Sequence, residues 1–280
     1  MLGLIGCHKP DLDPNANGYT SPIKPADISY AEVAARYNQT VEPFESLWSR
    51  TEVDIEWYEL EDDGDRAYRR ETGDGKFMYR RPGDTALLVE KLGKTYLWAG
   101  SNGERYWLFD MVDGDNKTAY VGEFAKLGQP GRRAFPMPVR PDMVPVLLGL
   151  LPLPPVSVLG EAPPVDLYEG RYLVEVDGLR MLIDPQTFRP ARVDLTDTAG
   201  FSVLTSKLEG RFPVEVEGVP DHRLPTIARK AEVYVSGYDS RLTVSMVFAT
   251  TEPRRVRDPM FDFDLLNQAM KIDRVEPLDR

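Results

Sequence analysis

Apolar and polar positions alternate with a period of two over much of the chain after residue 44. Val53, Ile55 and Trp57 alternate with polar neighbours, and five further apolar runs are separated by turn sequences such as Asn102-Gly103. These runs lie at 76–81, 85–92, 95–100, 104–110 and 117–124. The short turns between them are typical of hairpins, so this part of the chain is predicted to form an antiparallel meander.

The same alternation returns in the second half of the chain. Apolar residues recur at every second position in segments 172–176, 191–195, 212–216, 231–235 and 242–248. The sequence therefore predicts a mainly β protein of about ten or eleven strands. A sheet of that length must curl or close to bury its apolar face.

Two segments have helical patterns instead. Ser29 to Glu32 has the spacing of a capping box, and Tyr30, Val33, Ala34 and Tyr37 then repeat at helical intervals. A second, short helix is predicted inside the proline-rich segment 136–164, where it would place four apolar side chains on one face. They are Val144, Leu147, Leu148 and Leu151. This helix either plugs the open side of the sheet as ordinary core or acts as a movable lid over a cavity.

Composition narrows the function classes. The chain has 280 residues and a formal charge of −11, which disfavours nucleic acid as a partner. It has one cysteine and two histidines, so an intramolecular disulfide or a cysteine-rich zinc site is excluded. Asp221-His222 holds the one histidine of the predicted folded region, without a nucleophile motif nearby. The sequence thus predicts a protein that is not an enzyme and that has no metal or cofactor.

The first residues carry a local signal. Leu4-Ile5-Gly6-Cys7 resembles a bacterial lipobox, in which the cysteine is acylated and becomes the first mature residue. We therefore divide the chain into a residual signal segment (1–6), a lipid anchor and flexible tether (7–26) and a folded domain (27–280). A free cysteine at a frayed terminus is the alternative. His8 stands where such lipoproteins often have an aspartate that retains them in the inner membrane, which favours anchoring at the outer membrane.

Two further stretches resemble the LolA/LolB lipoprotein-carrier superfamily. Gly75 to Pro82, followed by Ala86 to Val89, is similar to the family's strand that ends in a basic-Arg-Pro step. Gly100 to Asp110 is similar to the hairpin with glycine and tryptophan that follows it. The resemblance implies an incomplete antiparallel β-barrel in which short helices act as a lid or plug over an apolar cavity.

The resemblance also implies roles for particular residues. Arg81 occupies the position of an arginine that holds the lid closed, although a solvated arginine at a strand end would look the same. Five aromatic residues are candidates for the cavity wall or for ordinary core: Phe77, Tyr79, Trp98, Trp107 and Phe109. The implied function is binding of acyl chains or lipoproteins on the periplasmic side of a bacterial envelope. The alternative is a sensor or scaffold that binds an envelope protein through the same fold.

Overall fold

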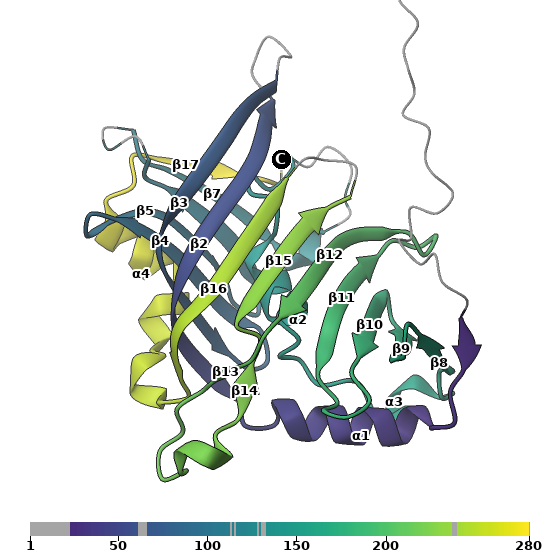
Figure 1. The fold of residues 1–280 in the computed structure, drawn as a ribbon. Helices are drawn as coiled ribbons and strands as arrows, with labels where there is room; N and C mark the ends of the chain where they lie inside the picture. Colours follow the sequence, from purple (N-terminus) through teal and green to yellow (C-terminus); the bar gives the residue numbers. More distant parts are fainter. Residues whose placement is uncertain are drawn as a thin grey trace, which may run out of the picture.

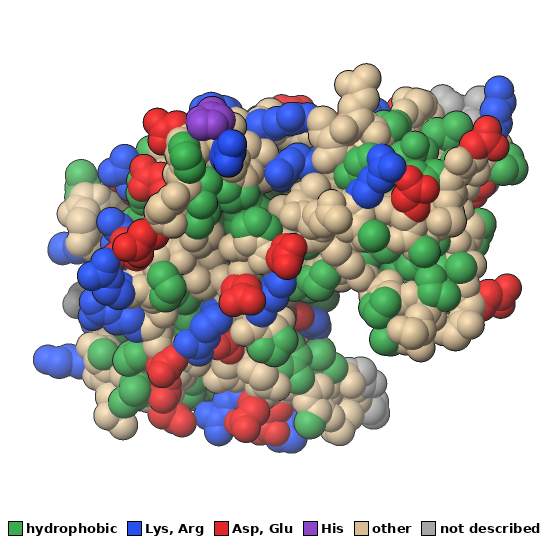
Figure 2. Space-filling model, turned by 90° about the horizontal axis from the view of Figure 1, so that it is seen from below, with side chains coloured by type: hydrophobic (Ala, Val, Ile, Leu, Met, Phe, Trp, Pro, Cys, Tyr) green, Lys and Arg blue, Asp and Glu red, His purple; other side chains and the backbone are tan. Residues whose placement is uncertain are grey.

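The computed structural model describes residues 23–60, 66–112, 114, 116–127, 129, 133–236 and 240–279. One large curved sheet dominates it (Figure 1). The sheet has 15 strands in the order β1-β8-β9-β10-β11-β12-β15-β16-β2-β3-β4-β5-β6-β7-β17. Its two edge strands, β1 and β17, are not paired with each other, so the sheet is an incomplete barrel. Seen from below, the molecular surface is deeply notched between two lobes, as expected of a sheet that does not close (Figure 2).

In the first half, β2 to β7 follow one another through short connections, whereas β1 is separated from β2 by α1 (Tyr30–Val41). The strands of this half are β1 (Lys24–Pro25), β2 (Ser46–Leu60), β3 (Arg66–Arg80), β4 (Asp84–Lys91), β5 (Lys94–Ser101), β6 (Arg105–Asp110) and β7 (Thr118–Glu123). The second half adds β8 (Val165–Tyr168), β9 (Arg171–Val176), β10 (Leu179–Ile183), β11 (Pro190–Thr196), β12 (Ser202–Glu209), β15 (Lys230–Val235), β16 (Arg241–Thr250) and β17 (Arg274–Pro277). Two short strands, β13 (Phe212–Pro213) and β14 (Thr226–Ile227), pair separately.

A long antiparallel pair, β2 and β3, lies in the middle of the strand order. It pairs in continuous register from Ser46 opposite Arg80 to Leu60 opposite Arg66. Strand β16 pairs with the other side of β2 and so joins the two halves of the sheet. Because the partners β16 and β2 are far apart in sequence, this central junction forms from long-range contacts.

The alternation along each strand gives the sheet two distinct faces. On β3, Phe77 and Tyr79 belong to the largest cluster of buried side chains, whereas Met78 belongs to a separate cluster on the opposite face. On β6, Leu108 likewise faces the largest cluster, whereas Trp107 and Phe109 do not. We call the face with the largest cluster the inner face and its opposite the outer face.

Short helices cover both faces. They are α1 (Tyr30–Val41), η1 (Phe124–Lys126), η2 (Pro141–Met143), α2 (Val144–Leu147), α3 (Val156–Leu159), η3 (Asp221–Arg223), η4 (Pro253–Arg255), η5 (Asp258–Phe261) and α4 (Phe263–Met270). Buried residues of α1 and α2 belong to the inner-face cluster, and Figure 1 shows α1 along the lower edge of the sheet. Helix α4 packs on the outer face.

Helix α1 forms where the sequence predicts it. The Ser29 side chain accepts a hydrogen bond from the Glu32 backbone N–H, which is the interaction expected of an N-cap. The residues that repeat at helical intervals, Tyr30, Val33 and Tyr37, are buried. The capping residue therefore sets where the helix starts, and the apolar stripe sets which side it turns to the sheet.

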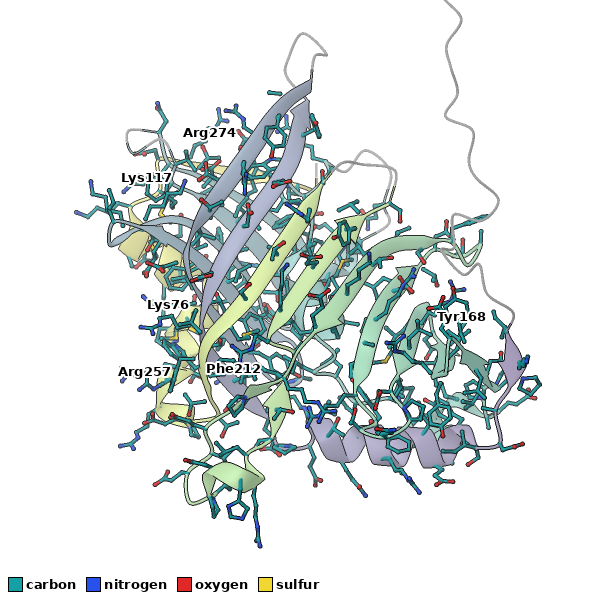
Figure 3. All side chains as sticks on the ribbon, in the orientation of Figure 1. Lys76, Lys117, Tyr168, Phe212, Arg257 and Arg274 are labelled. Carbon is teal, nitrogen blue, oxygen red and sulfur yellow. The ribbon has the colours of Figure 1, made fainter. Side chains whose placement is uncertain are left out.

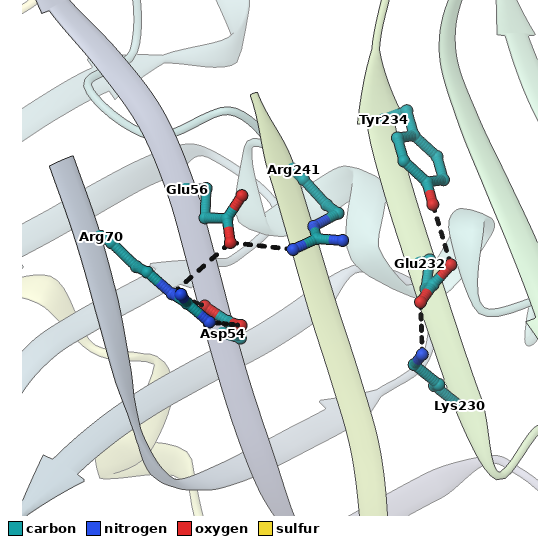
Figure 4. Close-up of polar contacts among 7 residues, drawn as sticks. All are labelled: Asp54, Glu56, Arg70, Lys230, Glu232, Tyr234 and Arg241. Atoms are coloured by element: carbon teal, nitrogen blue, oxygen red, sulfur yellow. Dashed lines mark hydrogen bonds and ion pairs between the residues drawn. The ribbon is translucent and has the colours of Figure 1, made fainter. Parts of the chain in front are cut away.

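Charged pairs cross the sheet on the outer face of β3, β2 and β16. Arg70 pairs with Asp54 at 2.8 Å and with Glu56 at 3.4 Å, and Arg241 pairs with Glu56 at 2.8 Å (Figure 4). On β15 the Glu232 carboxylate accepts hydrogen bonds from Lys230 and Tyr234, and these interactions hold its pKa below the ordinary value. Such exposed cross-strand pairs contribute little stability each, but they identify a solvated surface.

The predicted fold class is confirmed, with differences in detail. The strand count is higher than expected because several strands of two to five residues and the eight-residue β12 escaped the pattern. Strand β17 pairs parallel to β7 in an otherwise antiparallel sheet. The predicted strand at 212–216 is wrong beyond Pro213. The backbone N–H of Val214 still donates to the carbonyl of Pro225, next to β14, but the N–H of Glu215 donates to the carbonyl of Ala249 instead.

Candidate functional site

The proline-rich segment lies against the inner face of the sheet. We call residues 141–155 the lid segment. Its Val144, Leu147 and Leu148 side chains are buried in the inner-face cluster, and Leu151 is half-buried against it. Pro145 is accommodated in the first turn of α2, where its missing N–H costs no hydrogen bond. The four predicted residues therefore face the sheet together, although the regular helix itself ends at Leu147.

Three side chains of α1 hold the lid segment through its backbone. The Tyr30 hydroxyl donates to the Pro154 carbonyl at 2.7 Å. The Tyr37 hydroxyl lies 3.0 Å from the Gly149 carbonyl and 2.8 Å from the Leu151 carbonyl. Asn38 donates to the Leu153 carbonyl at 2.9 Å and accepts from the Leu153 N–H at 2.8 Å. One helix face thus satisfies the backbone of an irregular segment that lacks a strand or helix partner of its own at these positions.

Tyr37 is the most enclosed of these three side chains, and its ionisation makes the stability of the fold decrease at alkaline pH. Burial raises the pKa of its hydroxyl, with a smaller contribution from Tyr79, while Arg81 and Arg189 oppose the rise. An unfolded tyrosine ionises at a pH of about 10, so the stability contributed by neutral Tyr37 is complete below that pH and is lost as the pH rises toward the folded-state pKa.

We expect Tyr37→Phe to lower the free energy of unfolding by about 1–3 kcal/mol at neutral pH, because the carbonyls of Gly149 and Leu151 lose the single hydroxyl hydrogen that they share. The variant should also lose less stability than the wild type between about pH 8 and about pH 11. Urea unfolding at both pH values measures this. Tyr58→Phe, at an exposed position, is the control and should behave like the wild type. Parallel pH profiles for Tyr37→Phe and the wild type would contradict the assignment.

Arg81 lies at the junction of α1 with the sheet. Its Nη2 donates to the Val41 carbonyl at the end of α1, at 2.6 Å, and its backbone N–H donates to the Glu45 carbonyl. A cation at this end of a helix is favoured by the helix dipole. The hydrogen bonds that α1 side chains make to the backbone of the lid segment come from Tyr30, Tyr37 and Asn38, whereas the Arg81 side chain bonds to α1 itself. Its role as a latch stays a prediction.

The predicted wall residues divide between the two faces. Phe77 and Tyr79 are completely buried on the inner face, beneath α1 and the lid segment. Trp98, Trp107 and Phe109 lie on the outer face instead, where Phe263 of α4 stacks on Phe109 with ring centroids 5.4 Å apart. Placing them on the same wall is wrong, because residues 98, 107 and 109 have the opposite strand parity to their inward neighbours Leu97 and Leu108.

A cavity of about 260 Å³ opens at the upper part of the inner face. Leu97, Leu108, Met137, Trp57 and Tyr120 supply apolar surface, and a polar rim surrounds them. The rim contains Arg69, Glu71, Asp110, Asn116 and Thr118. The lining is therefore at least as polar as it is apolar, so this cavity suits a ligand with both kinds of surface.

The side chains that secure the lid segment were not identified from the sequence as functional. Tyr30 and Tyr37 are visible there as the apolar stripe of a helix, but their hydroxyl partners lie more than a hundred residues away in the chain. The signal that could have found them is a pair of tyrosines on a helix predicted to be buried, since a buried hydroxyl requires a partner.

Other predicted features lie outside this site. Cys7, the signal segment and the tether up to residue 22 lie outside the described residues. Among the helices of the described part of the chain, none combines the length and the apolar character needed to cross a bilayer. The described residues also hold no group of three or more histidine, cysteine, aspartate or glutamate side chains placed to bind a metal.

Comparisons with known proteins give matches only at the level of structure. No protein-family profile matches the sequence, and no curated protein sequence matches it. A LolA superfamily protein from Nitrosomonas europaea is similar in structure, with 9% identity, a TM-score of 0.46, and coverage of 85% of this chain and 99% of that one.

Two other solved structures are similar to the same extent. An outer membrane lipoprotein-sorting protein domain from Vibrio parahaemolyticus has 10% identity and a TM-score of 0.45, with coverage of 87% of this chain and 98% of that one. A DUF1329 family protein from Desulfovibrio piger has 11% identity and a TM-score of 0.45, with coverage of 85% and 97%. At these identities no residue's role is transferred from them.

Proposed function

We propose that this protein binds acyl chains, either of free lipids or of lipoproteins, between the inner face of the sheet and the lid segment. The observation that carries the proposal is how the inner face is covered. Below the cavity of about 260 Å³, the apolar residues of the inner face are covered by α1 and by the lid segment, in which the short α2 spans only Val144–Leu147. Displacing that segment would expose a continuous apolar surface on a curved sheet.

The energetics favour such an exchange of ligand for lid. Each methylene group removed from water contributes about 0.8 kcal/mol, so a dozen of them would supply roughly 10 kcal/mol before ordering costs. The polar attachments to be broken are the hydrogen bonds from Tyr30, Tyr37 and Asn38, each with a net value of about 1 kcal/mol. The acyl chain would also replace the buried side chains of Val144, Leu147 and Leu148, which contribute about 1.5–3 kcal/mol each, so a dozen methylenes roughly offset the contacts that they replace and longer chains favour the exchange.

The test is titration with an uncharged alkyl-chain fluorophore, followed by fluorescence as the probe leaves water. We expect saturable binding by the wild type and binding that is about three- to tenfold tighter for Tyr37→Phe, because the closed state loses about 1 kcal/mol of attachment. Tyr58→Phe, the matched control at an exposed position, should bind as the wild type does.

Two outcomes would contradict the proposal. Absence of saturable binding by both the wild type and Tyr37→Phe would exclude an acyl site at the inner face. Probe binding that is equal in all three proteins would show that the probe binds elsewhere, without displacing the lid segment. If a polypeptide segment competed with the probe while extracted lipids did not, the sensor or scaffold function would replace acyl-chain binding as the proposed function.

The proposal includes attachment to a membrane. Acylation of Cys7 would tether the domain on the periplasmic side of a bacterial envelope, with the outer membrane favoured by His8 at the next position. Mass spectrometry of the full chain, produced in a bacterium that processes lipoproteins, tests this. We expect an acyl mass on Cys7 and recovery in the membrane fraction, and Cys7→Ser should move the protein to the soluble fraction. An unmodified Cys7 in the membrane fraction would contradict lipid anchoring.

A further inference from the structure

A second cavity, of about 140 Å³, lies where the end of α1, the lid segment and the β10–β11 turn meet. Thr40 and Val41 line it from α1, and Leu148 and Gly149 line it from the lid segment. The opposite side is formed by residues around the ends of β11, β12 and β14, including Arg189 and Arg211. Phe212, the neighbour of Arg211, is labelled in Figure 3 near the C-terminal end of α1. The cavity has room for several water molecules or one small polyatomic group.

Neither arginine is neutralised at close range. In the part of the chain that the structure describes, no carboxylate lies within 4.0 Å of the guanidinium of Arg189 or Arg211. Arg189 donates to the backbone carbonyl of Thr226, which is a neutral partner. The nearest acid of the lining is Asp184, whose Oδ1 already accepts from the backbone N–H groups of Gln186 and Thr187. Two cationic groups thus line a cavity that contains one carboxylate, itself held in a turn.

We propose that this cavity binds the phosphate group of an anionic ligand between Arg189 and Arg211, at the edge of the lid segment. Guanidinium groups suit phosphate because their donors match its oxygens in paired hydrogen bonds. The hydroxyl of Thr226, which also lines the cavity, adds a neutral donor. The hydroxyls of Thr40 and Thr187 line it too, but they already hydrogen-bond to the Tyr37 carbonyl and to Asp184. The inference deepens the proposed function, because a phosphate held here would place the attached acyl chains beside the lid segment.

The electrostatics agree with this geometry. Burial lowers the pKa of Arg189, and the like charge of Arg211 lowers it further, while Tyr37 opposes the change. Burial tends to raise the pKa of Asp184, but hydrogen bonds from Thr187 and Gln186, together with Arg211, bring it below its ordinary value. A bound phosphate would relieve the repulsion between the two arginines.

The cavity also adjoins a close contact between the lid segment and β11. A Cβ on Gly149 would lie 2.4 Å from the Cγ of Pro190, the residue that follows Arg189. The same Gly149 accepts from Tyr37 through its carbonyl. A ligand bound at Arg189 would therefore contact the end of the lid segment that α1 secures.

The experiment is isothermal titration calorimetry of the full chain in phosphate-free buffer. The probes are inorganic phosphate, dihexanoylphosphatidic acid and the zwitterionic dihexanoylphosphatidylcholine. We expect saturable binding of the anionic probes and at least about tenfold weaker binding by Arg211→Gln, since a charge-assisted hydrogen bond is lost. Arg229→Gln is the matched control: it removes the same charge from a neighbouring arginine that stacks on Phe212 and does not line the cavity.

The outcomes separate the possible sources of the phosphate. Tighter binding of phosphatidic acid than of inorganic phosphate, lost in Arg211→Gln, supports a lipid headgroup. Equal binding of the two, also lost in Arg211→Gln, supports a site for free phosphate. No saturable binding of either anion, or equal losses in Arg211→Gln and Arg229→Gln, overturns the proposal. Binding of the uncharged alkyl probe, measured in parallel, should survive in Arg211→Gln, so failure of the acyl site is distinguishable from failure of the phosphate site.

Discussion

Replacing Gly149 with alanine is expected to lower the free energy of unfolding by about 2–5 kcal/mol. Gly149 has φ +66°, a left-handed conformation that costs an L-residue about 1–2 kcal/mol. The new methyl group would also lie 2.4 Å from the Cγ of Pro190, and overpacking of this kind costs about 1–3 kcal/mol. Because the contact joins the lid segment to β11, the strain should be relieved by displacing the lid segment.

Gly160 provides the matched control. It also has a positive φ, of +80°, but nothing lies within 4 Å of the position that a Cβ would take. Gly160→Ala should therefore show the conformational cost alone, about 1–2 kcal/mol. Urea unfolding followed by tryptophan fluorescence measures both, and the alkyl-chain probe should bind Gly149→Ala more tightly than Gly160→Ala. Equal losses of stability in the two variants would show that the contact with Pro190 does not hold the lid segment.

The sequence predicts those strands in which one face is apolar and the other is polar. The long strands β2 and β16 satisfy this condition, and they were located. Strand β12 was missed because its inward positions include the small polar residues Ser202 and Ser206 as well as Leu204. Strand β10 was missed for the opposite reason, since Arg180, Met181, Leu182 and Ile183 are buried regardless of the face they occupy. Periodicity measures burial on one face, and it fails where both faces are buried or where the inner face is polar.

Which face of a strand turns inward is a tertiary property. The alternation of Trp98 with Leu97 and of Trp107 with Leu108 is clear in the sequence, but both members of each pair are apolar. Leu97 and Leu108 belong to the inner cluster, and the aromatic residues belong to the outer one. The outer face is apolar here only because α4 covers it, and that helix lies more than 150 residues further along the chain. Without the position of α4, size alone favours the aromatic residues over the leucines for the inner face.

The candidate site shows the same division. The apolar residues of the lid segment could be found by their helical spacing, because each of them contacts the sheet through its own side chain. The attachment of that segment to α1 could not be found from the sequence. Tyr37 and Asn38 bond to the backbone carbonyls of Gly149 and Leu153, and a backbone carbonyl is chemically the same at every residue. That Arg189 and Arg211 line the same cavity also depends on how the turns after β10 and β12 meet, which the sequence does not show.

Replacing Phe263 with alanine is expected to lower the free energy of unfolding by about 3–5 kcal/mol, the usual cost of removing a buried phenylalanine. Phe263 is only 7% exposed, and its ring lies 5.4 Å from that of Phe109 and 5.9 Å from that of Trp107, measured between centroids. Gly100, opposite Trp107 on β5, leaves room for the indole to lie across the sheet, since a Cβ there would come within 2.6 Å of it. The cluster anchors α4 to the outer face.

Leu265 is the matched control on the same helix, because its side chain is 49% exposed and Leu265→Ala should change stability by less than about 1 kcal/mol. Urea unfolding gives both values. The decisive measurement is binding of the alkyl-chain probe to folded Phe263→Ala, which should stay within about twofold of the wild type, because Trp107 and Phe109 lie on the face opposite the acyl site. If the folded variant lost probe binding while Leu265→Ala kept it, the outer aromatic cluster would be part of the ligand wall, and the assignment of the two faces would have to be reversed.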